Sequence, residues 1–189
     1  MTDDDTLVHR PAPKRPQYGW QAWQATVGYI HNEYTPDAIL TLTAYPVADG
    51  VIGWSAALYW ENKAESVHDE DTLAGALRSL WLKVEAHHKL FKTLDAAVRR
   101  PVNYDDVEWL DEATQTALDR MFQVVEAASD SGWRLAITYQ AVDNPDVRVC
   151  VSLYAQDGTP QVDASGPSLR DACQNMYRNA ASYFRRQAR

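Results

Sequence analysis

The sequence predicts an α+β protein made of two tandem units that associate as a pseudo-dimer with antiparallel sheets. Each unit has the order helix, strand, strand, strand, helix. Three observations predict this fold: segments in which apolar and polar residues alternate, amphipathic segments before and after them, and the recurrence of the whole pattern after about 95 residues of the 189-residue chain. We expect the first unit to span residues 17–100 and the second to span residues 101–189.

Alternating apolar residues identify the first two strands of each unit. Residues 38–50 align with residues 133–145, and residues 51–60 align with residues 146–155. A slip of one residue would turn every side chain to the opposite face of a sheet, so agreement in phase over two stretches indicates equivalent strands. The matched apolar positions are Leu40, Leu42, Ala44, Ile52, Trp54, Ala56 and Leu58 in the first unit, and Leu135, Ile137, Tyr139, Val147, Val149, Val151 and Leu153 in the second.

A tight turn and a third strand complete each predicted sheet. The sequences ADG and DNPD separate the first two strands and have the composition of hairpin turns. Residues 64–68 and 159–165 then fit a short third strand. Because helices on one face leave the edges and the other face of so small a sheet uncovered, we expect the two sheets either to pair edge to edge or to stack.

Helical spacing follows each predicted sheet. Apolar side chains recur every three or four positions in residues 71–91 and 167–184. Thr72 and Ser168 stand where the N-cap of each helix is expected, because a hydroxyl there can accept a hydrogen bond from a free backbone N–H group.

The other segments are a first helix in each unit, a connector and an N-terminal leader. Spacings of three and four favour helices over residues 20–30 and 115–125. We expect the last helix of the first unit to continue to about Arg99, before Pro101 ends it. Residues 1–16 combine charge with three prolines and are expected to form a flexible leader.

Composition limits the classes of function. The formal net charge of -8 argues against non-specific binding to nucleic acid or acidic membranes, and no apolar segment approaches the length that spans a bilayer. Cys150 and Cys173 lie in apolar contexts that are typical of buried thiols. We expect a cytoplasmic protein that does not associate with membranes.

One cluster could be a metal or acid/base site. His68, Asp69, Glu70 and Asp71 immediately precede a predicted helix. Four consecutive residues usually point in different directions, and acids at this place are favoured by the positive end of the helix dipole. The second unit has DASGP there, with one acid, and the chain has no nucleophile motif or Gly-rich phosphate loop. We therefore expect no enzyme and no cofactor.

An acidic run in the connector is a candidate partner-binding surface. Asp105, Asp106 and Glu108 surround Trp109, so a basic protein could dock on the acids with the tryptophan as its aromatic anchor. The alternative is a solvated connector that leads to a helix N-cap at Asp111.

The last helix is a candidate anion-binding surface. Arg178, Arg185 and Arg186 lie near the C-terminus, and Arg170 lies at the start of the same helix. These side chains could bind a nucleic-acid backbone, although cations at the end of a helix also complement its dipole without any ligand. Both units carry more acids than cations, which disfavours nucleic acid as a partner.

The start of the last helix in each unit resembles the HicB-type antitoxin domain, in which two or three strands precede a G-D-T-x-x-E-A helix start. In DEDTLAGA and SGPSLRDA, Thr72 and Ser168 occupy the cap position, Asp71 is the acid before it, and Ala76 and Ala172 are the small helical residue. The Pro-x-x-x-Gly loop of the family is missing, and no DNA-binding segment follows. The resemblance implies a non-catalytic protein-binding module and not a repressor.

The order of elements is also similar to that of double-stranded-RNA-binding domains. Those domains need lysines at the start of the second helix to reach phosphates, whereas the second unit has Leu169, Arg170 and Asp171 there. This similarity implies an order of helices and strands and does not imply RNA binding.

The sequence thus predicts a non-catalytic protein-interaction module, antitoxin-like or regulatory, that acts through a protein partner or self-association. Two alternatives remain open. One is a nucleic-acid-binding domain that uses the Arg-rich last helix, and the other is a metal-dependent hydrolase with one site near His68 and Asp71.

Overall fold

The computed structural model describes residues 19–47, 51–87, 103–128, 132–144, 146 and 148–189. The leader expected over residues 1–16 and the extension of a helix to Arg99 lie outside the described residues.

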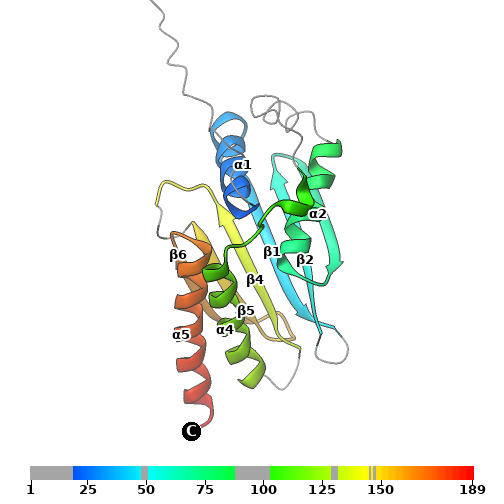
Figure 1. Ribbon diagram of the computed structural model, residues 1–189. Helices are drawn as coiled ribbons and strands as arrows, with labels where there is room; N and C mark the ends of the chain where they lie inside the picture. Colours follow the sequence, from blue (N-terminus) through cyan, green and yellow to red (C-terminus); the bar gives the residue numbers. More distant parts are fainter. Residues whose placement is uncertain (1–18, 48–50, 88–102, 129–131, 145, 147) are drawn as a thin grey trace, which may run out of the picture.

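Six antiparallel strands form one sheet with the order β3-β2-β1-β4-β5-β6, so the predicted α+β class is confirmed (Figure 1). The strands are β1 (Ile39–Pro46), β2 (Ile52–Trp60), β3 (Lys63–Glu70), β4 (Arg134–Gln140), β5 (Val149–Tyr154) and β6 (Pro160–Gly166). The helices are α1 (Gly19–Glu33), α2 (Leu73–His87), α4 (Glu112–Ala128) and α5 (Leu169–Gln187), with a short 3₁₀ helix, η2 (Tyr104–Asp106), before α4. Among the helices that the structure describes, none is long and apolar enough to cross a membrane.

The centre of the sheet is the antiparallel pair formed by β1 and β4. Leu42 lies opposite Ile137, and Leu40 lies opposite Tyr139. Of the two arrangements that the sequence left open, the three-stranded sheets therefore pair edge to edge. The first three strands lie on one side of this pair and the last three on the other, in one continuous sheet.

All four α-helices cover the same face of the sheet (Figure 1). On the central strands, alternate side chains such as Leu40 and Leu42 in β1 and Leu135 and Ile137 in β4 are fully buried, whereas the side chains between them are partly exposed. The sequence predicted this alternation and its phase correctly, because a strand with one buried face places apolar residues at every second position.

Aromatic side chains join the helices into one core. Trp23 of α1 meets Trp81 of α2 edge to face, with ring centroids 5.2 Å apart, and Trp54 of β2 meets Phe122 of α4 in the same way at 5.4 Å. Such pairs contribute about 0.5–1.5 kcal/mol each beyond the area that they bury. The pair between Trp54 and Phe122 crosses between the two halves of the chain, so the halves share one core.

Helix side chains cover the backbone of both edge strands. On β3, the Nζ atom of Lys83 donates to the carbonyl oxygen of Ser66 at 2.8 Å. On β6, the Nδ2 atoms of Asn175 and Asn179 donate to the carbonyl oxygens of Ser165 and Asp163, each at 2.9 Å. These contacts satisfy carbonyl groups that would otherwise be open to an added strand.

The start of α1 fits against the segment that precedes α4. The N–H group of Trp20 donates to the carbonyl oxygen of Trp109 at 3.1 Å. A Cβ atom on Gly19 would lie 2.1 Å from the Cα atom of Trp109, so the two backbones can approach this closely only because residue 19 is glycine.

Gly19 and Gly28 offer a matched pair of substitutions in α1. Gly19→Ala should lower the free energy of unfolding by about 1–3 kcal/mol, because the new methyl group would overlap backbone atoms of Trp109. Gly28→Ala should raise it by about 0.5–1 kcal/mol, because a Cβ atom there meets no atom within 4 Å and alanine favours the helix. Urea denaturation followed by circular dichroism measures both changes. Equal stability of the two variants would contradict the contact between Gly19 and Trp109.

Candidate functional site

The cluster of His68, Asp69, Glu70 and Asp71 is distributed between the end of β3 and the turn before α2. The sequence placed His68 at the end of the predicted third strand and the three acids between that strand and the helix, but β3 extends to Glu70 through a bulge against β2. Asp69 lies in the left-handed region at φ 60°. A bulge of this kind turns neighbouring side chains in different directions.

Asp69 is held by Tyr45. The Oη atom of Tyr45 donates to Oδ1 of Asp69 at 2.8 Å, and the N–H group of Asp69 donates to the same hydroxyl at 3.1 Å. Gly53 leaves room for the tyrosine ring, because a Cβ atom there would lie 2.8 Å from Cε2 of Tyr45. Burial, followed by the hydrogen bond to Asp69, raises the pKa of Tyr45. Asp69 thus has a structural role that requires no ligand.

The hydroxyl caps that the sequence predicted are confirmed. Oγ1 of Thr72 accepts from the N–H group of Gly75 at 2.9 Å, and Oγ of Ser168 accepts from that of Asp171 at 3.1 Å. His68 contacts Ser66 through Nε2 at 3.2 Å. Within the described residues, no group of three or more His, Cys, Asp and Glu side chains is arranged to hold a metal ion.

The acidic run before α4 is only partly a surface feature. Asp105 forms an ion pair with Arg78, and Asp105, Asp106 and Glu108 are exposed. Trp109, in contrast, is 7% exposed and packs against Trp81, so it offers little surface to a docking partner. Trp109 is held there by the hydrogen bond from the N–H group of Trp20 to its carbonyl oxygen and by the close approach of Gly19 to its backbone. Docking of a basic partner on the three acids stays a prediction.

Asp111 caps α4, as the sequence predicted. Its Oδ1 atom accepts from the N–H group of Thr114 at 2.9 Å, and its Oδ2 atom accepts from the Thr114 hydroxyl at 2.7 Å. The hydrogen bond from the Thr114 hydroxyl, together with those from backbone N–H groups, lowers the pKa of Asp111.

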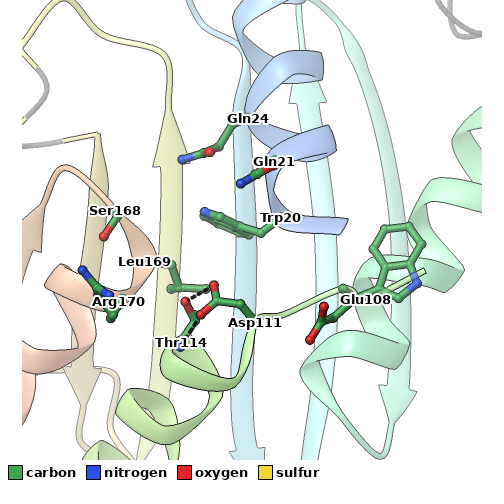
Figure 2. A pocket seen from close by; sticks show the side chains of 10 residues that line it. Trp20, Gln21, Gln24, Glu108, Asp111, Thr114, Ser168, Leu169 and Arg170 are labelled. Atoms are coloured by element: carbon green, nitrogen blue, oxygen red, sulfur yellow. Dashed lines mark hydrogen bonds between the residues drawn. The ribbon is translucent and has the colours of Figure 1, made fainter. Parts of the chain in front are cut away.

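A cavity of about 290 Å³ lies where α1, α4 and α5 begin. In Figure 2, side chains from the first turns of α1 face those at the start of α5, with Asp111 and Thr114 of α4 beside them. The side chains that line it are those of Trp20, Gln21, Gln24, Glu108, Trp109, Asp111, Thr114, Ser168, Leu169 and Arg170.

The cavity is lined by hydrogen-bond donors and by two side chains that cap helices. Arg170, Gln21 and Gln24 supply hydrogen-bond donors, and the indole Nε1 atom of Trp20 has no hydrogen-bond partner. Asp111 and Ser168, which could otherwise act as base and nucleophile, are engaged as helix caps. Among the described residues that line the cavity, none has an imidazole or a thiol.

A groove of about 470 Å³ between α4 and α5 brings together two arginines. Arg178 faces it from α5 and Arg120 from α4, beside Gln123, Gln174 and Tyr177, and no acid lines it. Neither guanidinium forms an ion pair with a described residue. The sequence singled out Arg178 but missed Arg120, because only the packing of α4 on α5 makes them neighbours.

The other two predicted anion-binding residues do not join this groove. The Nε atom of Arg186 donates to the carbonyl oxygen of Ser182 at 3.2 Å, and Arg186 lines a separate hollow beside β6. Arg185 is exposed in the last turn of α5. Arg178 and Arg186 thus line different hollows, and binding of an anion by Arg178, Arg185 and Arg186 stays a prediction.

The second face of the sheet carries no described helix (Figure 1). Two rows of side chains, aligned by the strand pairing, cross its middle. One row consists of Ser66, Ala57, Thr41, Thr138, Cys150 and Ser165, and the other of Ser55, Thr43, Ala136 and Ser152. All ten are partly exposed, small and uncharged, although 23% of the chain is Asp, Glu, Lys or Arg. We call these ten residues the neutral face.

Larger and charged side chains surround the neutral face. Ile39 and Tyr59 flank it at one end of the strands, and Tyr45 and Arg134 flank it at the other. Asp163 lies at its margin on β6, opposite Ser152 of β5.

No protein-family model and no curated protein matches the chain. The choice of a function therefore depends on the residues and their geometry.

Asp111 provides a test of the helix caps through pH. Because the pKa of Asp111 is lowered in the folded state, its stabilising effect is fully present above its unfolded pKa of about 4 and is lost as the pH falls through the folded value. Asp111→Ala should therefore cost about 1 kcal/mol at pH 7 and progressively less below about pH 4.

The matched control for this test is Thr72→Ala, which removes a cap that does not titrate. Its cost, also about 1 kcal/mol, should stay constant from about pH 7 to pH 3. Urea denaturation at several pH values measures both differences. A cost of Asp111→Ala that does not change with pH would contradict the role of the carboxylate.

Proposed function

We propose that this chain is a non-catalytic protein-interaction module, antitoxin-like or regulatory, that arose by tandem duplication and binds a protein surface through its neutral face. The observation that carries this proposal is the ten-residue neutral face in the middle of a six-stranded sheet whose described helices lie on its other side.

The register of the two halves supports the duplication. Leu40 lies opposite Leu58 in the first half, and Leu135 lies opposite Leu153 in the second. Leu135 lies about 95 residues after Leu40, and Leu153 lies about 95 residues after Leu58. This interval is the one after which the pattern of the sequence recurs. The pair of β1 and β4 would then join the two copies as two subunits join across a twofold axis.

The composition of the neutral face supports a protein partner. A sheet face that serves only to contact water usually carries charged residues among its threonines and serines, and such charges also prevent unwanted association. The neutral face has none. A nucleic-acid backbone would need lysine or arginine at these positions, which favours a protein surface as the partner.

Because helix side chains cover the edge strands, we expect a partner to bind the neutral face and not an edge of the sheet. Lys83, Asn175 and Asn179 occupy edge carbonyls, so a peptide strand added to β3 or β6 would have to displace them. Addition of a strand is therefore a less favourable mode of binding than contact with the neutral face.

The antitoxin-like character rests on the helix start at Thr72 and Ser168, each of which caps the last helix of its half after three strands. The hydrolase alternative has less support. Asp69 is hydrogen-bonded to Tyr45, and His68 is hydrogen-bonded to Ser66. These hydrogen bonds would have to break before either residue could bind a metal ion or act on a substrate.

The function can be tested with the double variant Thr43→Lys/Ala136→Lys, which places two charges in the neutral face. The matched control, Ala25→Lys/Asn32→Lys, adds the same charge at two exposed positions of α1, on the helical side. Affinity capture from the native host, followed by mass spectrometry, should recover one or more proteins with the wild type and the control but not with the face variant. Recovery of the same proteins with the wild type, the face variant and the control would show that the neutral face is not the binding surface.

A second candidate function is binding of a nucleic-acid backbone in the groove between α4 and α5. The observation that favours it is the presence of Arg120 and Arg178 together in a groove without acids. If this function is correct, the wild-type chain should retard duplex RNA or DNA in a gel at low salt. Arg120→Gln/Arg178→Gln should abolish this retardation, whereas Arg185→Gln should preserve it. If the wild type causes no shift, this candidate is excluded.

A further inference from the structure

We propose that the groove between α4 and α5 binds a small molecule that carries a phosphate monoester, with Arg120 and Arg178 holding its phosphoryl group. This inference does not rest on the proposed function, because every residue that lines the groove belongs to α4 or α5 and none belongs to the neutral face. Two cations that the fold does not account for, the donors beside them and the size of the groove support it.

The helix dipoles do not account for these two arginines. A cation stabilises a helix when it lies in the last turn, next to carbonyl groups that have no partner in the helix. Arg185 and Arg186 lie in the last turn of α5, but Arg178 lies in the middle of that helix. Arg120 lies in the middle of α4, whose last turn has no basic residue.

Acids on the same helices do not account for them either. A cation on a helix can pair with an acid three or four positions away. Around the two arginines, these positions hold Thr116, Ala117, Gln123, Val124, Gln174, Asn175, Ala181 and Ser182. Asp119, which adjoins Arg120, instead accepts a hydrogen bond from Gln115 at 2.7 Å. Among the described residues, no acid therefore compensates the two charges in the groove.

Hydrogen bonds orient one of the two guanidinium groups. The Nη1 atom of Arg178 donates to Oδ1 of Asn175 at 3.4 Å, and Asn175 is itself bonded to the carbonyl oxygen of Ser165 at 2.9 Å. Because a guanidinium group has five N–H donors, most of those on Arg178 stay available to a ligand. The side-chain amides of Gln123 and Gln174 add donors from both helices.

This set of donors favours a phosphoryl group over other anions. A carboxylate has two oxygen atoms, and one guanidinium fork can bind both of them. A phosphate monoester has three acceptor oxygens and a charge of about -1.5 to -2 at pH 7, so it can accept from both forks. A nucleic-acid backbone has one charge per phosphate, and its further phosphates would meet a chain with a net charge of -8.

The size of the groove indicates that the ligand is larger than phosphate itself. Its volume of about 470 Å³ lies within the range of about 300–1,000 Å³ that is typical of small-molecule sites. The space beyond the phosphoryl group can therefore hold an organic body. Tyr177, which is 40% exposed, lines the groove and offers a ring on which a flat body can pack.

The experiment is a titration followed by proton–nitrogen NMR at low salt. Ribose 5-phosphate or adenosine monophosphate should bind with a Kd below about 1 mM, and inorganic phosphate should bind more weakly because it lacks the organic body. The amide signals that shift should be those of residues 117–123 and 174–178. Added salt should raise the Kd, because the two arginines are exposed and their charges are screened.

Two related compounds test the charge of the bound group. Cyclic adenosine monophosphate has the same base and sugar as adenosine monophosphate, but its phosphate is a diester with one charge. It should bind at least about tenfold more weakly, because it presents less charge and fewer free oxygens to the two forks. Adenosine, which has no phosphate, should cause no shift in the groove.

Variants locate the site. Arg120→Gln and Arg178→Gln should each raise the Kd by about tenfold, and Arg178→Lys should raise it by less, because lysine keeps the charge but loses the fork. The matched control is Arg185→Gln, which removes the same charge from the same helix outside the groove and should leave the Kd within about twofold. Circular dichroism checks that each variant folds, and the titrations of the wild type test the inference even if one does not.

The inference is overturned if none of the three monoanionic or dianionic phosphate probes shifts the signals of the groove at about 10 mM. Equal affinity of the wild type and Arg120→Gln/Arg178→Gln also overturns it. So does equal affinity for adenosine monophosphate and its cyclic diester, a result that would favour the nucleic-acid backbone instead. None of these measurements involves the neutral face, so the inference and the proposed function can fail independently.

Discussion

The pairing of β1 with β4 is the constraint on which the other features of the structure depend. It joins strands that are far apart in the sequence, with Leu42 opposite Ile137 at its centre, and it turns two three-stranded sheets into one. Once these strands pair in this register, the apolar side chains of both halves point to one face. The four helices then share a single core, because each must bury its apolar side against that same face.

In the same arrangement, no helix that the structure describes covers the second face of the sheet. A stack of two three-stranded sheets would have buried part of that face inside the molecule. In the single sheet, one row of small side chains instead crosses all six strands, and a second row crosses the four strands from β2 to β5. The absence of charge on this surface follows from the residues, but its extent follows from the way the strands align. The proposed interaction depends on both.

Much of the fold was predictable because its causes are local. Alternation in β1 and β4 and the hydroxyls of Thr72 and Ser168 act within a few residues of chain, so the buried face of each strand and the starts of α2 and α5 follow from the sequence. Trp109 is a residue whose burial did not follow from the sequence. It stands among acids in the sequence, and only the approach of α1 to its backbone carries it into the core.

The sequence by itself determined which residues form strands and helices and which side of each is apolar. The tertiary structure alone decided that the sheets join edge to edge, that Arg120 meets Arg178, and that the ten uncharged residues lie together on one face. The physical reason is that periodicity reflects contacts with near neighbours in the chain. The choice between edge pairing and stacking depends on hydrogen bonds and packing between distant segments, whose partners no local pattern specifies.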